Sequence, residues 1–290
     1  MRNIGLDALH IFKTVAEQGG ITKAAAKLNR VQSNVTTRVK QLEAQLGTQL
    51  FLRQNRKLTL SPEGRLLLSY ADQMLRLSSE AEAVVRDRAP RGTLRLGTLE
   101  STAAARLSPI LSRYHLAYPE VRIELVTGTT GALITKVLNY EVEAAFVAEP
   151  FTANNLDSQI AFREKLVLIT PKGFPKVRTP KDIGRQTIIA FETGCSYRRI
   201  LRDWLGRAKV VPERVLEFGS YHAIVACVAS GAGIAIVPES VIRSVRVEKD
   251  VALHPLPAAV ANVRTLLVWR RGHQSLALEA LRQELRDMKE

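Results

Sequence analysis

The sequence ITKAAAKLNRVQSNVTTRVKQLEAQLG, residues 21–47, decides the fold of the first part of this chain. Three consecutive alanines at 24–26 favour a short helix over 23–28, with Thr22 as its expected N-cap. A brief turn follows, and a second helix is expected to begin at Gln32 or Ser33 and to end at Gly47. The stretch therefore predicts two helices joined by a tight turn.

The second of these helices has two different faces. Its apolar residues recur at three- and four-residue spacing and form the expected buried stripe: Val35, Val39, Leu42 and Leu46. The opposite face carries short polar side chains and a cation: Gln32, Ser33, Thr36, Thr37 and Lys40. A helix fits the major groove of DNA, where such side chains can bond base edges. The pattern favours a helix-turn-helix, although periodicity alone also allows an unrelated small helical bundle.

The flanking segments complete a small domain. Upstream, one apolar helical face ends at Gly19 and Gly20: Leu6, Leu9, Phe12, Val15 and Ala16. Downstream, the apolar segments 50–52 and 58–60 enclose a polar tip at 53–57, which is typical of a β-hairpin. Because that tip carries three basic residues, it could hold a DNA phosphate, and this favours the helix-turn-helix.

A long helix is expected over 61–88. Ser61 is its N-cap, and Pro62 occupies the first helical position. A heptad-like seam runs along it: Leu67, Ala71, Met74, Ser78, Ala81 and Val85. A helix of this length with its own seam is interpreted as a dimerising element. The sequence Ala-Pro-Arg-Gly at 89–92 ends it and marks a domain boundary.

The remaining 200 or so residues alternate between expected strands and helices. Strands are expected at 94–97, 121–126, 144–147, 166–170, 187–191, 215–218, 234–237 and 265–269. Helices are expected at 103–118, 131–139, 197–205, 222–230 and 276–288, with a further helix start at 179–182. Repeated strand–helix units predict an α/β fold, and the length suits two lobes that face a cleft.

Composition and charge narrow the class of protein. The 290 residues are 46% hydrophobic and carry a formal net charge of +14, so disordered, collagen-like and disulfide-framework classes are excluded. The excess charge lies in two blocks: 1–65 has eleven basic and four acidic residues, and 163–214 has thirteen and five. This basic excess indicates a polyanionic partner. The presence of only two cysteines and the lack of a signal-peptide pattern lead us to expect a cytoplasmic protein.

These motifs together resemble those of the LysR-type transcriptional regulators over essentially the whole chain. The resemblance rests on the segments 22–28, 39–43, 50–53, 60–64 and 231–238, together with Gln32 and Thr36. The chain departs from the family pattern at four positions, which here are Arg30, Val31, Ser33 and Thr37. Because the family has arginine at the last of these, a phosphate or base contact is in doubt there, with Arg38 or Arg30 as substitutes. The operator sequence is therefore not carried over.

The resemblance implies a winged helix-turn-helix at 1–60, a dimerising linker helix at 61–90 and a periplasmic-binding-protein-like sensor at 91–290. Within the sensor, lobe 1 would comprise 91–162 and 265–290, and lobe 2 would comprise 163–264. It also implies a homotetramer that binds promoter DNA and changes its assembly when a small co-inducer enters the sensor. RNA polymerase is a further implied partner. No membrane contact and no cofactor is expected. No metal site is expected either, since the five histidines lack the spacing of metal ligands.

Candidate DNA contacts follow from the outward face of the 32–46 helix and from the hairpin tip. For base edges and nearby phosphates we select Gln32, Ser33, Thr36 and Thr37, and for the minor groove or backbone Arg53. Further phosphate candidates are Arg30, Arg38, Lys40 and Arg56. The alternative for each of these residues is a solvated polar surface.

Candidate effector contacts lie in three loops that each follow a strand and precede a helix, where free amides favour an anion. They are Glu100, Ser101, Thr102, Thr129, Thr130, Cys195, Ser196 and Arg198. We expect a small carboxylate-bearing metabolite held by the hydroxyl-bearing residues, with simple helix capping as the alternative for each. Glu100 would repel an anion or accept an amine. Cys195 allows a redox alternative, because a helix N-terminus and Arg198 could lower the pKa of its thiol.

The sequence does not favour two other classes of function. An enzyme is not expected, since no Gly-x-Ser-x-Gly, phosphate-loop or dinucleotide motif occurs. A free-standing solute-binding protein would suit the second part of the chain, but it would need neither the N-terminal helices nor their basic residues.

Overall fold

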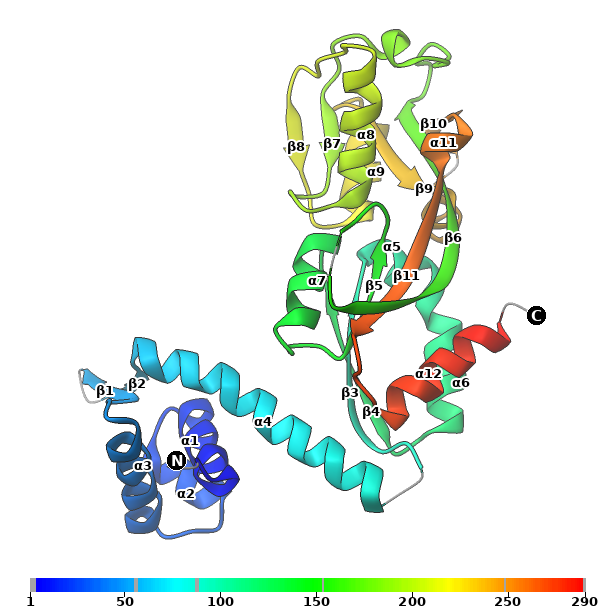
Figure 1. Ribbon diagram of the computed structural model, residues 1–290. Coiled ribbons are helices and arrows are strands. Elements are labelled where there is room, and N and C mark those ends of the chain that lie inside the picture. Colours follow the sequence, from blue (N-terminus) through cyan, green and yellow to red (C-terminus); the bar gives the residue numbers. More distant parts are fainter. Residues whose placement is uncertain (1–3, 55–56, 87–88, 153, 248, 289–290) are drawn as a thin grey trace. The chain divides into compact units, whose positions relative to one another are not determined.

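The computed structural model describes residues 4–54, 57–86, 89–152, 154–247 and 249–288. The chain forms two compact units, residues 1–88 and 89–290 (Figure 1). Among the described residues, no helix combines the length and the apolar character needed to cross a membrane.

The N-terminal unit begins with three helices: α1 (Leu6–Gln18), α2 (Ile21–Lys27) and α3 (Gln32–Leu46). Gly19 and Gly47 end α1 and α3 with left-handed backbone conformations at φ of 65° and 70°, which glycine adopts without steric cost. Ala24 and Ala25 are buried where α2 meets α1 and α3. The helix-turn-helix expected from residues 21–47 is therefore present.

Two local expectations about these helices are wrong. Helix α2 begins at Ile21 with Gly20 as its N-cap, so Thr22 lies inside the helix. Leu46 is 37% exposed, and only the three other apolar residues of its stripe are buried. The last turn of α3 extends past the core, so the helical period alone does not bury Leu46.

The hairpin and the linker helix follow as expected. Strands β1 (Phe51–Gln54) and β2 (Lys57–Leu60) pair antiparallel, and α4 (Pro62–Arg86) begins directly after them. The buried Ser61 hydroxyl accepts a hydrogen bond from the Gly64 amide at 2.9 Å and donates one to the Gln49 carbonyl at 2.7 Å. Ser61 thus caps α4 and ties its start to the segment between α3 and β1.

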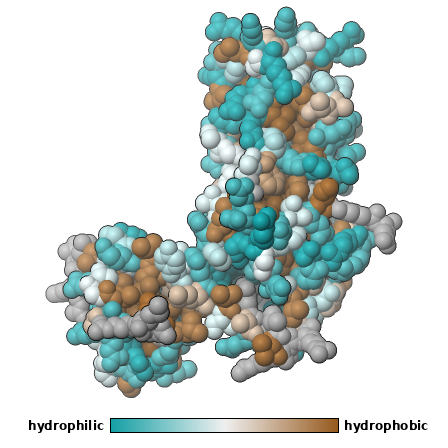
Figure 2. Space-filling model, viewed as in Figure 1, coloured by the Kyte–Doolittle hydropathy of each residue, from teal (hydrophilic) through white to brown (hydrophobic). Residues whose placement is uncertain are grey.

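The exposed apolar residues of α4 form a line along the helix. Over the first turns of α4 this line lies one residue earlier in the sequence than the expected seam. Ala71 is fully buried and Leu67 partly buried against the core of the N-terminal helices. Other apolar side chains of α4 are exposed: Leu66, Tyr70, Met74, Leu77 and Val85. Figure 2 shows brown apolar surface on this unit. The expected seam was therefore wrong at Leu67 and Ala71, because packing on α1 uses them.

The second unit is built on a curled mixed sheet in the order β10-β6-β11-β5-β3-β4, with β9 also pairing with β6. The strands are β3 (Gly92–Thr98), β4 (Val121–Thr127), β5 (Ala144–Ala148), β6 (Leu156–Pro171), β9 (Ala235–Pro238), β10 (Val251–Pro255) and β11 (Asn262–Arg270). Strands β3, β4 and β5 are parallel, whereas β6 and β11 run antiparallel to their neighbours. The long strands β6 and β11 connect the two lobes (Figure 1).

Helices cover both faces of the sheet in the first lobe, and successive side chains of β5 pack alternately against the two layers. Ala144 and Phe146 belong to the core with α6 (Ser108–Ala117) and α12 (Leu276–Asp287). Ala145 and Val147 point to the opposite face, where α7 (Thr130–Leu138) packs. Because successive side chains of a strand face opposite ways, one buried strand serves both layers.

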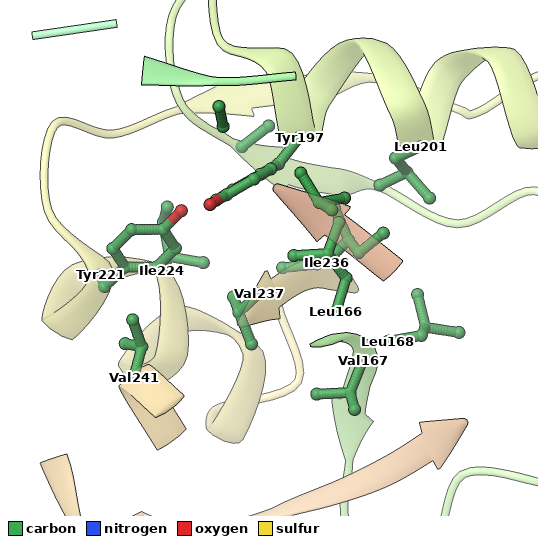
Figure 3. Packing of buried hydrophobic residues seen from close by; sticks show 14 of the residues in the cluster. Leu166, Val167, Leu168, Tyr197, Leu201, Tyr221, Ile224, Ile236, Val237 and Val241 are labelled. Carbon is green, nitrogen blue, oxygen red and sulfur yellow. The ribbon is translucent and has the colours of Figure 1, made fainter. Parts of the chain in front are cut away.

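The second lobe adds a short parallel pair, β7 (Ile188–Ala190) and β8 (Val215–Glu217), beside β9. Its helices are α8 (Ser196–Arg207), α9 (Tyr221–Ala229), α10 (Glu239–Val245) and α11 (Ala258–Ala261), with a 3-10 turn η2 (Pro180–Ile183). Figure 3 shows residues of β6 and β9, among them Leu166, Leu168 and Val237, packed with side chains of α8 and α9.

Several elements differ from the expected bounds. The helix expected at 103 begins earlier, as α5 (Glu100–Thr102) and the π-helical segment η1 (Ala103–Leu107) before α6. Strand β6 begins at Leu156, ten residues before the expected start, since its first half is polar and is held by pairing with β11. Helices α10 and α11 and strand β10 were not predicted. Their short segments depend on contacts with β6.

Candidate functional site

The polar face of α3 is open to solvent. Gln32, Ser33, Thr37, Arg38 and Lys40 are exposed, opposite the buried Val35 and Val39. Thr36 is only partly exposed, and its hydroxyl donates a hydrogen bond to the Gln32 carbonyl at 2.9 Å. The face therefore offers donors and acceptors in the form that a major groove accepts.

Arg30 has a partner within the chain. Its two terminal nitrogens donate to the Asp7 carboxylate at 2.7 and 3.2 Å, across the turn before α3. This hydrogen bond and the nearby positive charges lower the pKa of Asp7 below its usual range. Arg30 is thus held in place by a carboxylate that partly neutralises it, which weakens its case as a phosphate ligand.

The hairpin is attached to α3 through Glu43, a residue that the sequence analysis did not select. Its Oε1 atom accepts hydrogen bonds from the Leu50 amide at 2.8 Å and the Phe51 amide at 3.3 Å. Arg53 lies in β1 opposite Leu58, but its side chain and all of Arg56 fall outside the described residues. A contact between a helix carboxylate and backbone amides seven and eight residues later does not show in the spacing of apolar residues. The role of Glu43 could therefore not be predicted from the sequence.

In the second unit, a cleft between the lobes gathers most of the expected effector residues. Its lining consists of Leu99, Glu100, Ser101, Gly128, Thr129, Thr130, Ala148, Phe191, Cys195, Ser196, Tyr197 and Tyr221. It encloses about 280 Å³ of empty space, counting the part open to solvent. Thr102 is buried nearby but does not line it, and Arg198 faces an adjoining groove.

Four helices begin at this cleft. Glu100, Thr130, Ser196 and Tyr221 are the first residues of α5, α7, α8 and α9 respectively. The unpaired amides of a helix N-terminus carry a partial positive charge, so four such ends together favour a negatively charged group. No lysine or arginine is among the lining residues, so backbone dipoles provide the positive potential there.

The two lobes touch beside the cleft. The Gly131 amide of the first lobe donates to the Gly194 carbonyl of the second at 3.2 Å, and the Ser196 hydroxyl donates to the Ala148 carbonyl at 2.8 Å. Gly194 has φ of 99°, and a Cβ atom there would lie 2.8 Å from the Thr129 hydroxyl. This close approach requires glycine.

Three of the selected hydroxyls already have partners in the loops. Thr129 Oγ1 accepts from the Ala132 amide at 3.4 Å, as an N-cap of α7. Thr130 Oγ1 bonds both the amide and the carbonyl of Ala148, at 3.2 and 3.3 Å. With Ser196 also bonded to Ala148, these side chains hold the loops together and leave backbone amides and other hydroxyls to face a ligand.

Two tyrosines that the sequence analysis did not select form the inner wall. The buried hydroxyls of Tyr197 and Tyr221 point toward each other from the starts of α8 and α9 (Figure 3). Burial raises the pKa of both phenols, so both stay protonated donors. The Tyr197 hydroxyl lies beside the Ser101 and Thr265 hydroxyls, close enough for both to act on its pKa, but neither contact has good hydrogen-bond geometry among the described residues. From the sequence alone, an aromatic residue of a helix that lines a ligand cleft cannot be distinguished from one that packs in the hydrophobic core.

Glu100 brings a carboxylate into the same cleft. Its Oε1 atom accepts from the Tyr221 amide at 3.3 Å, while Oε2 is buried and has no partner among the described residues. Burial raises the pKa of this carboxyl above its usual range, although the Tyr221 amide and His222 act against that shift.

Cys195 lacks the environment of a redox-active thiol. Burial raises the pKa of the thiol, despite the amides of Arg198 and Tyr197 beside it. The Arg198 side chain instead donates to the Glu217 carboxylate at 2.5 Å and to the Phe191 carbonyl at 3.1 Å. This environment argues against the redox alternative. Within the described ranges, no three His, Cys, Asp or Glu side chains group as metal ligands do.

Comparison with known proteins gives two family matches that together cover most of the chain. Residues 6–65 match the bacterial regulatory helix-turn-helix of the lysR family, and residues 87–290 match the LysR substrate binding domain. The chain is 40% identical over 264 residues to the uncharacterized HTH-type transcriptional regulator YusT of Bacillus subtilis (strain 168), covering 91% of this chain and 88% of YusT. It is 37% identical over 286 residues to the HTH-type transcriptional regulator GltR of the same organism, covering 98% and 97%.

Solved structures share the fold over nearly the full length. Full-length OxyR from Pseudomonas aeruginosa aligns with a TM-score of 0.73 at 20% identity, covering 99% of this chain and 96% of that one. CbnR in complex with its target DNA aligns with a TM-score of 0.69 at 22% identity, covering 98% and 99%. At these identities the likeness concerns the fold alone.

Proposed function

The chain belongs to the LysR family of transcriptional regulators, and on that premise we propose that a small carboxylate-bearing metabolite in the cleft controls its binding to promoter DNA. Its helix-turn-helix is the DNA-binding domain, and its second unit is the effector-binding domain. The N-terminal match leaves no role for the chain as a free-standing solute-binding protein.

The convergence of four helix N-termini on one narrow cleft carries the proposal for the ligand. Amides at the starts of α5, α7 and α8 would supply donors, and the Ser101 and Tyr197 hydroxyls would supply more. At the start of α9 the Tyr221 amide already donates to Glu100, so that helix would contribute its dipole. A carboxylate meets such donors in charge-assisted hydrogen bonds, each contributing about 1.5–3 kcal/mol. A neutral ligand would gain less from the same groups. No resident cofactor is part of the proposal.

On the DNA side, α3 would enter the major groove. Gln32, Ser33 and Thr37 would meet base edges, and Arg38 and Lys40 would meet phosphates. The basic hairpin beside α3 would add contacts through Arg53, held in position by the Glu43 hydrogen bonds to the hairpin's first residues. The regulator would act in the cytoplasm, where promoter DNA is accessible.

Self-association would multiply these contacts. The exposed apolar line on α4 suits pairing with a second copy, and a pair of dimers would form the homotetramer that the family resemblance implies. Contact with RNA polymerase stays a prediction.

Isothermal titration calorimetry of the full chain tests the ligand class. We would titrate small aliphatic and aromatic carboxylates, each against its own primary amide, which keeps the shape and removes the charge. At least one carboxylate should bind at least tenfold more tightly than its amide. Binding of neutral or cationic compounds alone would refute the proposal. A gel shift with the DNA upstream of the chain's own gene tests the DNA activity independently.

A further inference from the structure

Glu100 does not suit a cleft built only for an anion. Its carboxylate lines the same space as the starts of α7 and α8, and its Oε2 atom is buried without a hydrogen-bond partner among the residues described. An unpartnered buried acceptor is costly, so structures that keep one usually complete it with a ligand or water. Glu100 therefore presents an unused acceptor to whatever enters the cleft.

A plain carboxylate would meet this acceptor unfavourably. Two like charges in a narrow space of low dielectric repel each other, and no lysine or arginine lines the cleft to offset them. Of the basic side chains nearby, Arg198 is engaged with Glu217 and the Phe191 carbonyl, and His222 is exposed outside the lining. A positive charge on the ligand itself would offset this repulsion at Glu100, while the helix N-termini act on its negative end.

The surroundings of Glu100 also favour a cation. Tyr221, whose amide bonds Glu100, packs against Phe191 with ring centroids 4.7 Å apart and planes tilted by 59°. Aromatic rings attract an ammonium group placed over their faces, and both rings line the cleft. An ammonium near Glu100 Oε2 would thus have a carboxylate and two aromatic rings around it.

We propose that the ligand is a zwitterion of the amino-acid class, whose ammonium binds Glu100 and whose carboxylate binds at the starts of α7 and α8. The proposal rests on the proposed function and narrows it from any carboxylate to one that carries an amine. Tyr197 lines the cleft, and its buried hydroxyl, which has no contact of good hydrogen-bond geometry among the described residues, would provide a donor to the carboxylate end.

Calorimetry with matched triplets on the full chain tests this. Each triplet contains an amino acid, its deaminated acid and its decarboxylated amine: alanine, propionate and ethylamine; leucine, 4-methylpentanoate and 3-methylbutylamine; phenylalanine, 3-phenylpropionate and 2-phenylethylamine. The other common amino acids complete the panel. We expect one amino acid to bind at least tenfold more tightly than both of its partners.

The Glu100→Gln variant isolates the carboxylate. Glutamine keeps an oxygen that can accept from the Tyr221 amide and removes the charge, so it should abolish the tenfold gap between the amino acid and its deaminated acid. Glu192→Gln is the matched control, because Glu192 is exposed in the loop before α8 and does not line the cleft. That control should keep the gap.

The outcomes separate the two proposals. If a deaminated acid binds wild-type chain as tightly as its amino acid, the zwitterion is ruled out while the carboxylate ligand stands. If no carboxylate binds, both fail. If Glu100→Gln keeps the gap, Glu100 is not the ammonium site and the proposal is overturned. Should that variant not fold, the comparison in wild-type chain still decides.

Discussion

At the scale of single residues, Tyr197 is the sharpest probe of the cleft. Its hydroxyl is buried and has no contact of good hydrogen-bond geometry within the described ranges, so the unliganded protein gains little stability from it. Tyr197→Phe should therefore leave the thermal midpoint unchanged or slightly raised. It should weaken ligand binding by about 1 kcal/mol, roughly fivefold, because one hydrogen bond is lost. Calorimetry and thermal unfolding measure both effects, and a destabilised variant with normal affinity would contradict this role.

Gly233 is required by packing rather than by backbone conformation. A Cβ atom there would lie 2.3 Å from the Thr187 carbonyl oxygen, which also bonds the Ile234 amide. Gly233→Ala should lower the free energy of unfolding by about 1–3 kcal/mol through overpacking. Gly206→Ala in α8 is the control, since nothing lies within 4 Å of its added Cβ and alanine favours helix by up to about 1 kcal/mol. Equal denaturation midpoints for the two variants would contradict the packing argument.

His254 should make the sensor less stable in mild acid. It is buried, its Nδ1 atom accepts from the Val177 amide at 3.1 Å, and burial lowers its pKa below the usual 6.5. The unfolded chain therefore binds a proton at a higher pH than the folded chain. The free energy of unfolding should fall as pH drops below about 6.5, by at most about 1.4 kcal/mol per pH unit. In urea unfolding from pH 7.5 to 5, His254→Gln should reduce this slope and His115→Gln, at an exposed site, should not.

At the scale of elements, the exposed apolar line on α4 predicts where the chain self-associates. Leu77→Glu places a charge on that line, where Leu77 is 67% exposed in the single chain. Burying a leucine contributes about 1.5–3 kcal/mol, so the dimer dissociation constant should rise at least tenfold. Ser79→Glu, exposed on another face of α4, should have no such effect. Sedimentation equilibrium measures both, and equal dissociation constants would exclude α4 as the dimer interface.

The elements also show what local sequence can predict. Helix α3, the hairpin and α4 follow from short-range signals, namely helical spacing, Gly47, Ser61 and the paired apolar segments. The exposed apolar line of α4 differs from the expected seam because Leu67 and Ala71 pack on α1. The spacing of apolar residues within α4 does not show that contact. Strand β6 began early because pairing with β11 holds its polar first half.

The cleft was predictable only in part, for the same reason. Each of its loops was recognisable as a strand-to-helix turn, and Ser101, Thr129 and Ser196 do lie together. Tyr197 and Tyr221 carry no local mark of function, since their place in the cleft depends on how α8 and α9 meet. Their hydroxyls face each other only in the folded lobe (Figure 3).

At the scale of the whole molecule, the net charge of +14 comes mainly from two blocks of the sequence, residues 1–65 and 163–214. The basic excess of residues 1–65 accompanies the exposed face of α3, as expected for a surface that meets phosphates. Part of the excess in 163–214 is offset by carboxylates outside that block, because Lys165 pairs with Glu239 and Arg198 with Glu217. The two blocks are thus not equivalent, and only the first lies in the DNA-binding domain.

The central claim is that a ligand in the cleft changes how the chain holds DNA. The direct test is fluorescence anisotropy of the full chain on a duplex from upstream of its own gene, with footprinting, with and without the tightest ligand from calorimetry. We predict that a saturating ligand shifts the DNA dissociation constant several-fold or alters the footprint in wild-type chain, and that Glu100→Gln, at the same ligand concentration, shows neither. A ligand that occupies the cleft while affinity and footprint stay unchanged would contradict the account.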